Sequence, residues 1–130
     1  MDKKILGLAA LLGGIAVILG AFGAHGLKAV LDESQLLTFE TGVRYQVYHA
    51  LFLLFVSITP SCTAKAKKAI AYLVGFGVLF FSGSIYLLAT NDLTPIDFKF
   101  LGPITPVGGL LLITAWFTVA YQAFFVKKGI

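Results

Sequence analysis

The chain has 130 residues, of which 58% are hydrophobic and only 12% are charged, and its formal net charge is +4. A soluble domain is typically about 45–50% apolar and about 25% charged, so this composition excludes an ordinary soluble protein and favours one membrane-embedded domain over residues 1–130. The positive charge does not indicate a nucleic-acid-binding surface, because the lysines gather at the ends of apolar runs. We therefore expect membrane lipids, and no nucleic acid, as partners.

Four apolar runs follow one another along the chain, at 5–24, 43–59, 69–89 and 106–126. Each is close to the roughly 20 residues that cross the hydrocarbon core of a bilayer as a helix. A backbone in lipid must satisfy its own hydrogen bonds, and none of the runs alternates in hydrophobicity as a barrel strand would. The sequence predicts an all-α, polytopic membrane protein that folds as a four-transmembrane-helix bundle.

The basic residues divide unequally between the segments that join these runs. Three segments, namely the N-terminus, the loop after the second run and the C-terminus, hold Lys3, Lys4, Lys65, Lys67, Lys68, Lys127 and Lys128. The opposite side has only Lys28, Lys99 and Arg44, the last of which stands at the start of the second run. Short loops rich in lysine and arginine stay in the cytoplasm, so both termini are predicted to be cytoplasmic, in a multi-pass protein of the inner (plasma) membrane.

The first run, 5–24, is too long for the apolar part of a signal peptide and is expected to be a retained helix. Its small residues fall on one narrow arc at helical spacing. Small residues let helix backbones approach closely in lipid, so this arc is predicted to face another helix. The residues expected to pack helices together, here and in the later runs, are Ala9, Gly13, Ala16, Gly20, Gly75, Gly108 and Gly109.

Before the second run, Asp32 or Ser34 is expected to cap a helix that continues to about Thr59. The fourth helix is expected to begin with Thr105 as its N-cap and Pro106 at its first position. The second helix would enter from the outer face, which places its polar first turns beneath that surface. His25 ends the first run at the same level.

Polar side chains from three predicted helices are therefore expected to form a cluster that faces outward: His25, Glu40, Arg44, Tyr45, Gln46, Tyr48, His49, Ser82 and Tyr86. Glu40 and Arg44 have the i, i+4 spacing of a helical ion pair. Three interpretations remain open for the cluster. In the first, the side chains hydrogen-bond one another and so tie helix ends together. In the second, they form a ligand or ion site, and in the third they anchor the chain at the membrane–water interface.

Catalytic and cofactor chemistry is not favoured by these residues. Haem needs axial ligands that face each other, whereas His25 is expected to lie shallower than His49. A structural zinc needs about four ligands, which the chain does not offer at one end. No catalytic residue, metal or cofactor is predicted, although enzymatic activity stays open.

Four motif stretches are specific as a set: "LGAFGAHGL" (19–27), "FETGVRYQVYHAL" (39–51), "FSGSIYLL" (81–88) and "LGPITPVGGLLLITAW" (101–116). With them, the chain resembles the small bacterial inner-membrane family of unknown function typified by YgdD and YwdK. The resemblance implies an integral membrane protein of about four helices without an agreed activity or cofactor. It supplies no catalytic residue to assign.

The leading functional hypothesis is a non-enzymatic, small-ligand- or lipid-binding or transport-associated protein with an outward-facing polar cluster. One alternative is a structural scaffold or accessory subunit of a larger membrane complex. The other is a small membrane enzyme or cofactor binder that uses His25 and His49. A homo-oligomer or a membrane-protein partner is compatible with each hypothesis.

Overall fold

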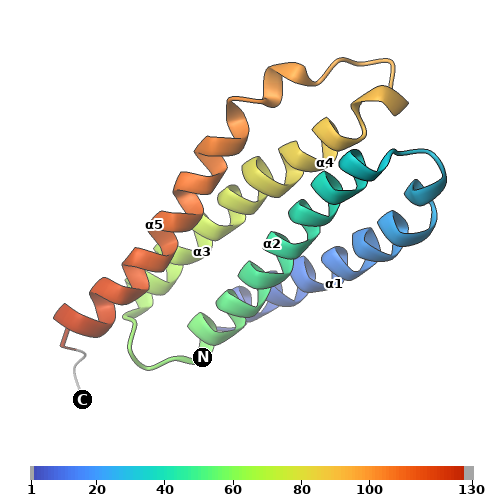
Figure 1. Ribbon diagram of the computed structural model, residues 1–130. Coiled ribbons are helices and arrows are strands. Elements are labelled where there is room, and N and C mark those ends of the chain that lie inside the picture. The colour runs from blue at the N-terminus through green and yellow to red at the C-terminus, as the bar shows by residue number, and fades with distance from the viewer. Residues whose placement is uncertain (1, 128–130) are drawn as a thin grey trace.

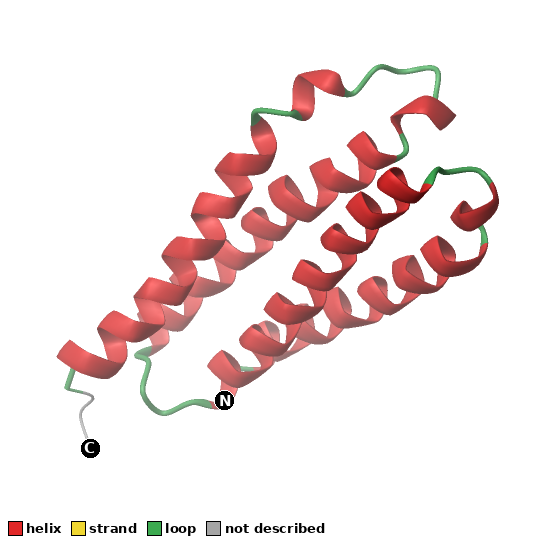
Figure 2. Cartoon of the chain, viewed as in Figure 1, coloured by secondary structure: helices red, strands yellow, loops and turns green. Residues whose placement is uncertain are grey.

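The computed structural model describes residues 2–127, and throughout this range the chain forms helices, turns and loops (Figures 1 and 2). The predicted all-helical fold is therefore confirmed. The long elements are α1 (Lys3–His25), α2 (Glu33–Ile58), α3 (Ala64–Val78) with α4 (Ser84–Ala89), and α5 (Ile104–Phe125). Of the residues used to predict topology, Lys128 lies outside the described range.

The first two helices form an antiparallel hairpin (Figure 1). Asp2 caps α1 by accepting the backbone N–H groups of Lys4 and Ile5. Asp32, one of the two predicted caps, begins α2 through a capping box with Gln35. The short 3₁₀ turn η1 (Leu27–Ala29) joins the two helices, and α2 then runs for 26 residues to Ile58, as the sequence predicts.

The third apolar run forms one continuous helix from Ala64 to Ala89 that contains a wide turn. This turn is the π-helical segment η2 (Leu79–Gly83), which lies between α3 and α4. A π turn inserts one extra residue into a helix and frequently lies at a functional site. Two 3₁₀ turns, η3 (Asn91–Leu93) and η4 (Lys99–Leu101), then lead across the end of the bundle to α5.

The loop between these two turns is organised by its own polar groups. Asn91 donates to Asp97 and accepts the backbone N–H of Phe98, while Asp97 also accepts the N–H of Lys99. The bond from Lys99, followed by that from Asn91, holds the pKa of the exposed Asp97 carboxyl below its ordinary value. The loop therefore has a defined conformation over the end of the bundle.

The predicted start of the fourth helix is wrong. Helix α5 begins at Ile104, and its N-cap position is occupied by Pro103, which forms no side-chain cap. The hydroxyl of Thr105 instead shares a hydrogen bond with that of Ser84. The Thr105 side chain, which the local pattern predicts as a cap, therefore forms a hydrogen bond to the neighbouring helix instead.

Three helical segments are long and apolar enough to cross a bilayer among the residues that the structure describes: Lys3–Ala29, Ala64–Ala89 and Lys99–Phe125. Helix α2 is of similar length but less apolar, because its first half carries the polar residues of the predicted cluster. A membrane crossing by α2, the four-span topology and the cytoplasmic placement of the termini therefore stay predictions.

Helix α1 packs on α2, α2 packs on α3 and α4, and α5 packs on α3 and η2, so that α2 and α3–α4 are central (Figure 1). The main hydrophobic core lies toward the lysine-rich end, around Leu53, Val56, Ile70 and Val74. A smaller core of Leu27, Leu31, Phe39 and Ala89 closes the opposite end. Helix α2 therefore packs directly on α1, α3 and α4, and it reaches α5 through the side chains of His49 and Phe52.

Candidate functional site

Gln46 is the central member of the polar cluster and is almost completely buried. Its Nε2 donates to the carbonyl oxygen of Leu12 on α1 at 2.9 Å, and its Oε1 accepts the hydroxyl of Tyr86 on α4 at 2.7 Å. The Tyr86 ring reaches this position because Gly42, one turn before Gln46, leaves space for it; a Cβ atom at Gly42 would lie 2.7 Å from Tyr86 Cε1. One amide therefore joins three helices.

His49, one turn farther along α2, joins this helix to α5. Its Nδ1 lies 2.7 Å from the carbonyl oxygen of Tyr45, and its Nε2 lies 3.0 Å from Nε1 of Trp116. An indole N–H can only donate, so Nε2 accepts and the proton of the neutral imidazole resides on Nδ1. Trp116 also packs against Phe52, with ring centroids 4.1 Å apart. No local pattern indicates this pair, because Trp116 lies 67 positions from His49 in an apolar run.

Ser82 lies within the π turn and is fully buried. Its hydroxyl donates to the carbonyl oxygen of Gly42 at 2.7 Å, which ties the π turn to α2. The hydrogen bond between Ser84 and Thr105 ties the next turn to the start of α5. These contacts explain how the hydroxyl groups of the third helix are satisfied within the bundle.

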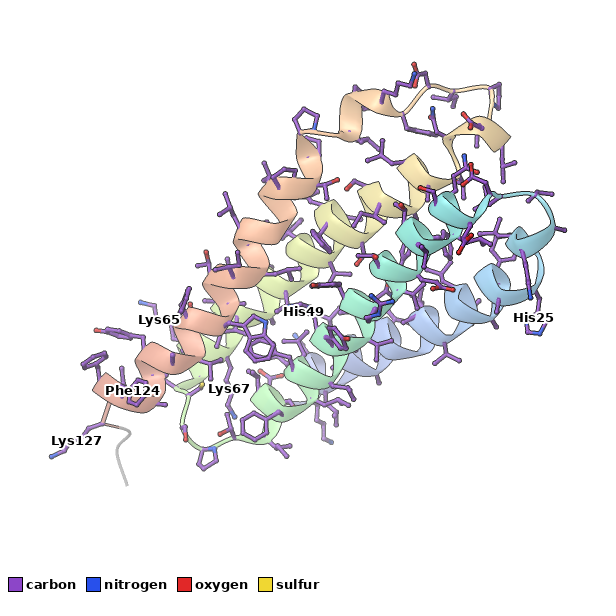
Figure 3. All side chains as sticks on the ribbon, in the orientation of Figure 1. His25, His49, Lys65, Lys67, Phe124 and Lys127 are labelled. Atoms are coloured by element: carbon purple, nitrogen blue, oxygen red, sulfur yellow. The ribbon has the colours of Figure 1, made fainter. Side chains whose placement is uncertain are left out.

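The structure does not bring the other predicted cluster members into this interior network. Glu40 and Arg44 are exposed and, among residues 2–127, form no ion pair with each other. Tyr45 and Tyr48 are also exposed and stack edge to face on the surface of α2. His25 lies at the far end of α1, where its ring bonds the Ala21 carbonyl, well away from His49 (Figure 3).

Within the described range, every buried side-chain nitrogen and oxygen has a hydrogen-bond partner. No group of three or more His, Cys, Asp or Glu side chains in that range is arranged to hold a metal ion. The interior network can therefore fix helix positions, and it leaves limited spare capacity for a ligand. Tyr86 donates its hydrogen to Gln46 but keeps oxygen lone pairs, so it can still accept a hydrogen bond.

A groove opens beside this network, between α1 and the α3–η2–α4 helix. It has a volume of about 390 Å³, and Gln46 and Tyr86 contribute its polar lining. The remaining lining is apolar or glycine: Leu12, Ile15, Leu19, Gly75, Val78, Leu79 and Gly83. We call this hollow the lateral groove. It exists because α1 packs mainly on α2 and α3 packs mainly on α5, which leaves α1 and α3 in slight contact.

Lysines gather at the end of the bundle where α1 and α3 begin (Figure 3). Lys67 differs from its exposed neighbours Lys65 and Lys68, because it is buried and its Nζ donates to the carbonyl oxygen of Ser57 at 3.3 Å. A cation is favourable at this position, near the C-terminal end of α2. The sequence pattern could not distinguish this interior lysine from its exposed neighbours.

A family model described as "Protein of unknown function (DUF423)" matches residues 19–109. A UPF0382 membrane protein of Staphylococcus haemolyticus is 40% identical over 94% of this chain and 96% of its own length. A relative with the same description from Haemophilus influenzae is 37% identical over 98% of this chain and 99% of its own. The UPF0382 membrane protein YwdK of Bacillus subtilis is 36% identical over 84% of this chain and 86% of its own length. No solved structure matches significantly. The resemblance drawn from the four motif stretches is thus confirmed.

Proposed function

This chain belongs to the DUF423 family of UPF0382 membrane proteins, and we propose that it is a non-enzymatic protein that binds a lipid-like ligand in the lateral groove. The ligand would enter sideways from the bilayer. The apolar walls would hold a hydrocarbon chain, and the Gln46–Tyr86 pair would be the polar part of the lining that this chain passes.

The lateral groove is the observation that carries this proposal. Its volume of about 390 Å³ falls in the range of roughly 300–1,000 Å³ that is usual for small-molecule sites. Such sites combine mostly apolar walls with a few polar groups, which is the composition found here. The groove runs beside helices apolar enough for a membrane, so its contents would exchange with lipid rather than water.

The walls of the groove are open because two small residues face it. A Cβ atom at Gly75 would meet nothing closer than Leu8 Cδ2, at 3.9 Å, and one at Gly83 would meet only Leu79, also at 3.9 Å. Neither glycine is needed for close helix contact. The space that they leave is therefore available to a ligand, and larger side chains can be introduced there to fill it.

The test uses Gly75→Leu, which fills the groove, and Gly14→Leu as its matched control. Gly14 lies on α1 with nothing within 4 Å of a Cβ atom, so the control adds the same side chain outside the groove. Full-length protein in nanodiscs of phosphatidylcholine is released into a mass spectrometer under native conditions, and the bound lipid is counted. Gly75→Leu is expected to lower lipid retention while Gly14→Leu retains it.

Folding is checked in the same samples by the midpoint of thermal unfolding. Gly83→Leu is a second groove-filling variant in case Gly75→Leu unfolds the protein. Equal lipid retention in wild-type protein and in a folded groove-filling variant would overturn the proposal, since the bound lipid would then lie elsewhere on the surface.

A further inference from the structure

We infer that the ligand is a single anionic phospholipid, whose headgroup lies at Lys4 and Lys68 and one of whose acyl chains follows α1 and α3 into the lateral groove. This inference rests on the proposed function and specifies its ligand. It is carried by the continuity of three hollows, by the charge at one end of them and by their length.

The three hollows succeed one another along the crevice between α1 and α3. The first, of about 460 Å³, is lined by Asp2, Lys4 and Lys68 together with apolar residues and Tyr72. It shares Leu8, Ala71 and Tyr72 with a middle hollow of about 180 Å³. The middle hollow shares Gly75 and Leu79 with the lateral groove. A single surface track thus runs from a polar end to the Gln46–Tyr86 pair.

The polar end of the track is electrostatically suited to an anion. Lys4 and Lys68 line it from α1 and α3, and both helices begin at this end. Their N-terminal dipoles therefore add partial positive charge to that of the two lysines. The single carboxylate there, Asp2, accepts the N–H groups of Lys4 and Ile5 and is thereby engaged in capping α1.

The length of the track matches one lipid chain. From Lys4 to Leu19 the α1 axis rises by roughly 22 Å at 1.5 Å per residue. One leaflet contributes about half of the roughly 30 Å hydrocarbon core, which leaves several ångströms for the glycerol and phosphate. Gln46 bonds the carbonyl oxygen of Leu12, which lies only about 12 Å along the axis from Lys4, so a chain from a phosphate at the lysines would pass the Gln46–Tyr86 pair and end near Leu19. The hydroxyl of Tyr72, at the polar end, would lie beside the glycerol region.

The experiment compares retention of phosphatidylglycerol and phosphatidylcholine in mixed nanodiscs by native mass spectrometry. The variant is Lys4→Gln/Lys68→Gln. The matched control is Lys65→Gln/Lys127→Gln, which removes the same charge from exposed lysines that do not line the track. Wild-type protein is expected to retain phosphatidylglycerol preferentially. The variant is expected to lose about fivefold in preference for each lysine removed, and the control is expected to retain the preference.

Two outcomes would overturn the inference. The first is an equal loss of preference in the variant and in the control, which would mean that net charge, and not the track, selects the lipid. The second is a lipid-free dimer that Gly75→Leu converts to a monomer, because a second copy of the chain would then fill the track. If Gly75→Leu lowers lipid retention but the lysine variants do not change headgroup preference, the proposed function stands and only the anionic ligand is excluded.

Discussion

The two long helix pairs, α1 with α2 and α5 with α3, are both rich in small residues, but they use them differently. A Cβ atom at Gly13 would lie 3.6 Å from that of Ala50, and one at Gly20 would lie 3.4 Å from Val43 Cγ1, which are ordinary contacts. In the second pair, a Cβ atom at Gly108 would overlap the backbone nitrogen of Phe81 and lie 2.7 Å from the carbonyl carbon of Phe80. The same sequence pattern therefore marks contact with side chains in one pair, at ordinary distances at Gly13 and Gly20, and backbone-to-backbone contact in the other.

The π turn explains this difference. It brings the backbone of Phe80 and Phe81 toward α5, and only a residue without a side chain fits opposite them. On its other side the turn directs Ser82 to α2. The pair α3–α5 thus meets by direct backbone contact, whereas α1 packs on α2 through side chains, the bond from Gln46 and the bond from the Asp2 N–H to the Ser57 carbonyl. The lateral groove opens on the side of α1 that faces α3.

The largest effect is expected from Gly108→Ala, because its methyl group cannot be accommodated without separating α5 from the π turn. We expect a loss of about 3 kcal/mol in the free energy of unfolding, at the upper end of values for overpacking. The measurement is reversible denaturation in mixed micelles. Gly109→Ala is the control, since its Cβ atom would lie 3.7 Å from the Phe81 ring and should be tolerated. Similar stability of the two variants would contradict a backbone contact at Gly108.

A smaller effect is expected from Gln46→Leu, which removes the bonds to Leu12 and Tyr86. Interhelical hydrogen bonds in membranes contribute about 0.6 kcal/mol on average and about 1.7 at most, so two such bonds indicate a loss of about 1–2 kcal/mol. A double-mutant cycle with Tyr86→Phe isolates the pair. A coupling energy indistinguishable from zero would show that this hydrogen bond does not hold α4 to α2.

The smallest effect, and one of opposite sign to that of Gly108→Ala, is expected from Gly13→Ala. The site has room for the methyl group, and alanine is favoured over glycine inside a helix by about 0.5–1 kcal/mol. The same denaturation measurement should therefore show slightly higher stability. A clear loss of stability would mean that α1 and α2 approach more closely than their Cβ contacts indicate, and the contrast between the two helix pairs would disappear.

The sequence by itself determined the helical class, the apolar composition typical of a membrane protein, the family, and the start of α2 to within Asp32 or Ser34. It could do so because periodicity, apolar length and short motifs are local properties of the chain. It also singled out Gln46, His49, Ser82 and Tyr86, since polar groups in apolar runs are conspicuous.

Only the tertiary structure decided which partners these groups have. His49 bonds Trp116, Thr105 bonds Ser84, and Lys67 bonds Ser57. In each pair the two residues are at least ten positions apart in the chain. The π turn, the close approach at Gly108 and the lateral groove likewise arise where two helices meet. The contacts of a residue across such an interface depend on the rotation and spacing of both helices, which no local pattern along one of them specifies.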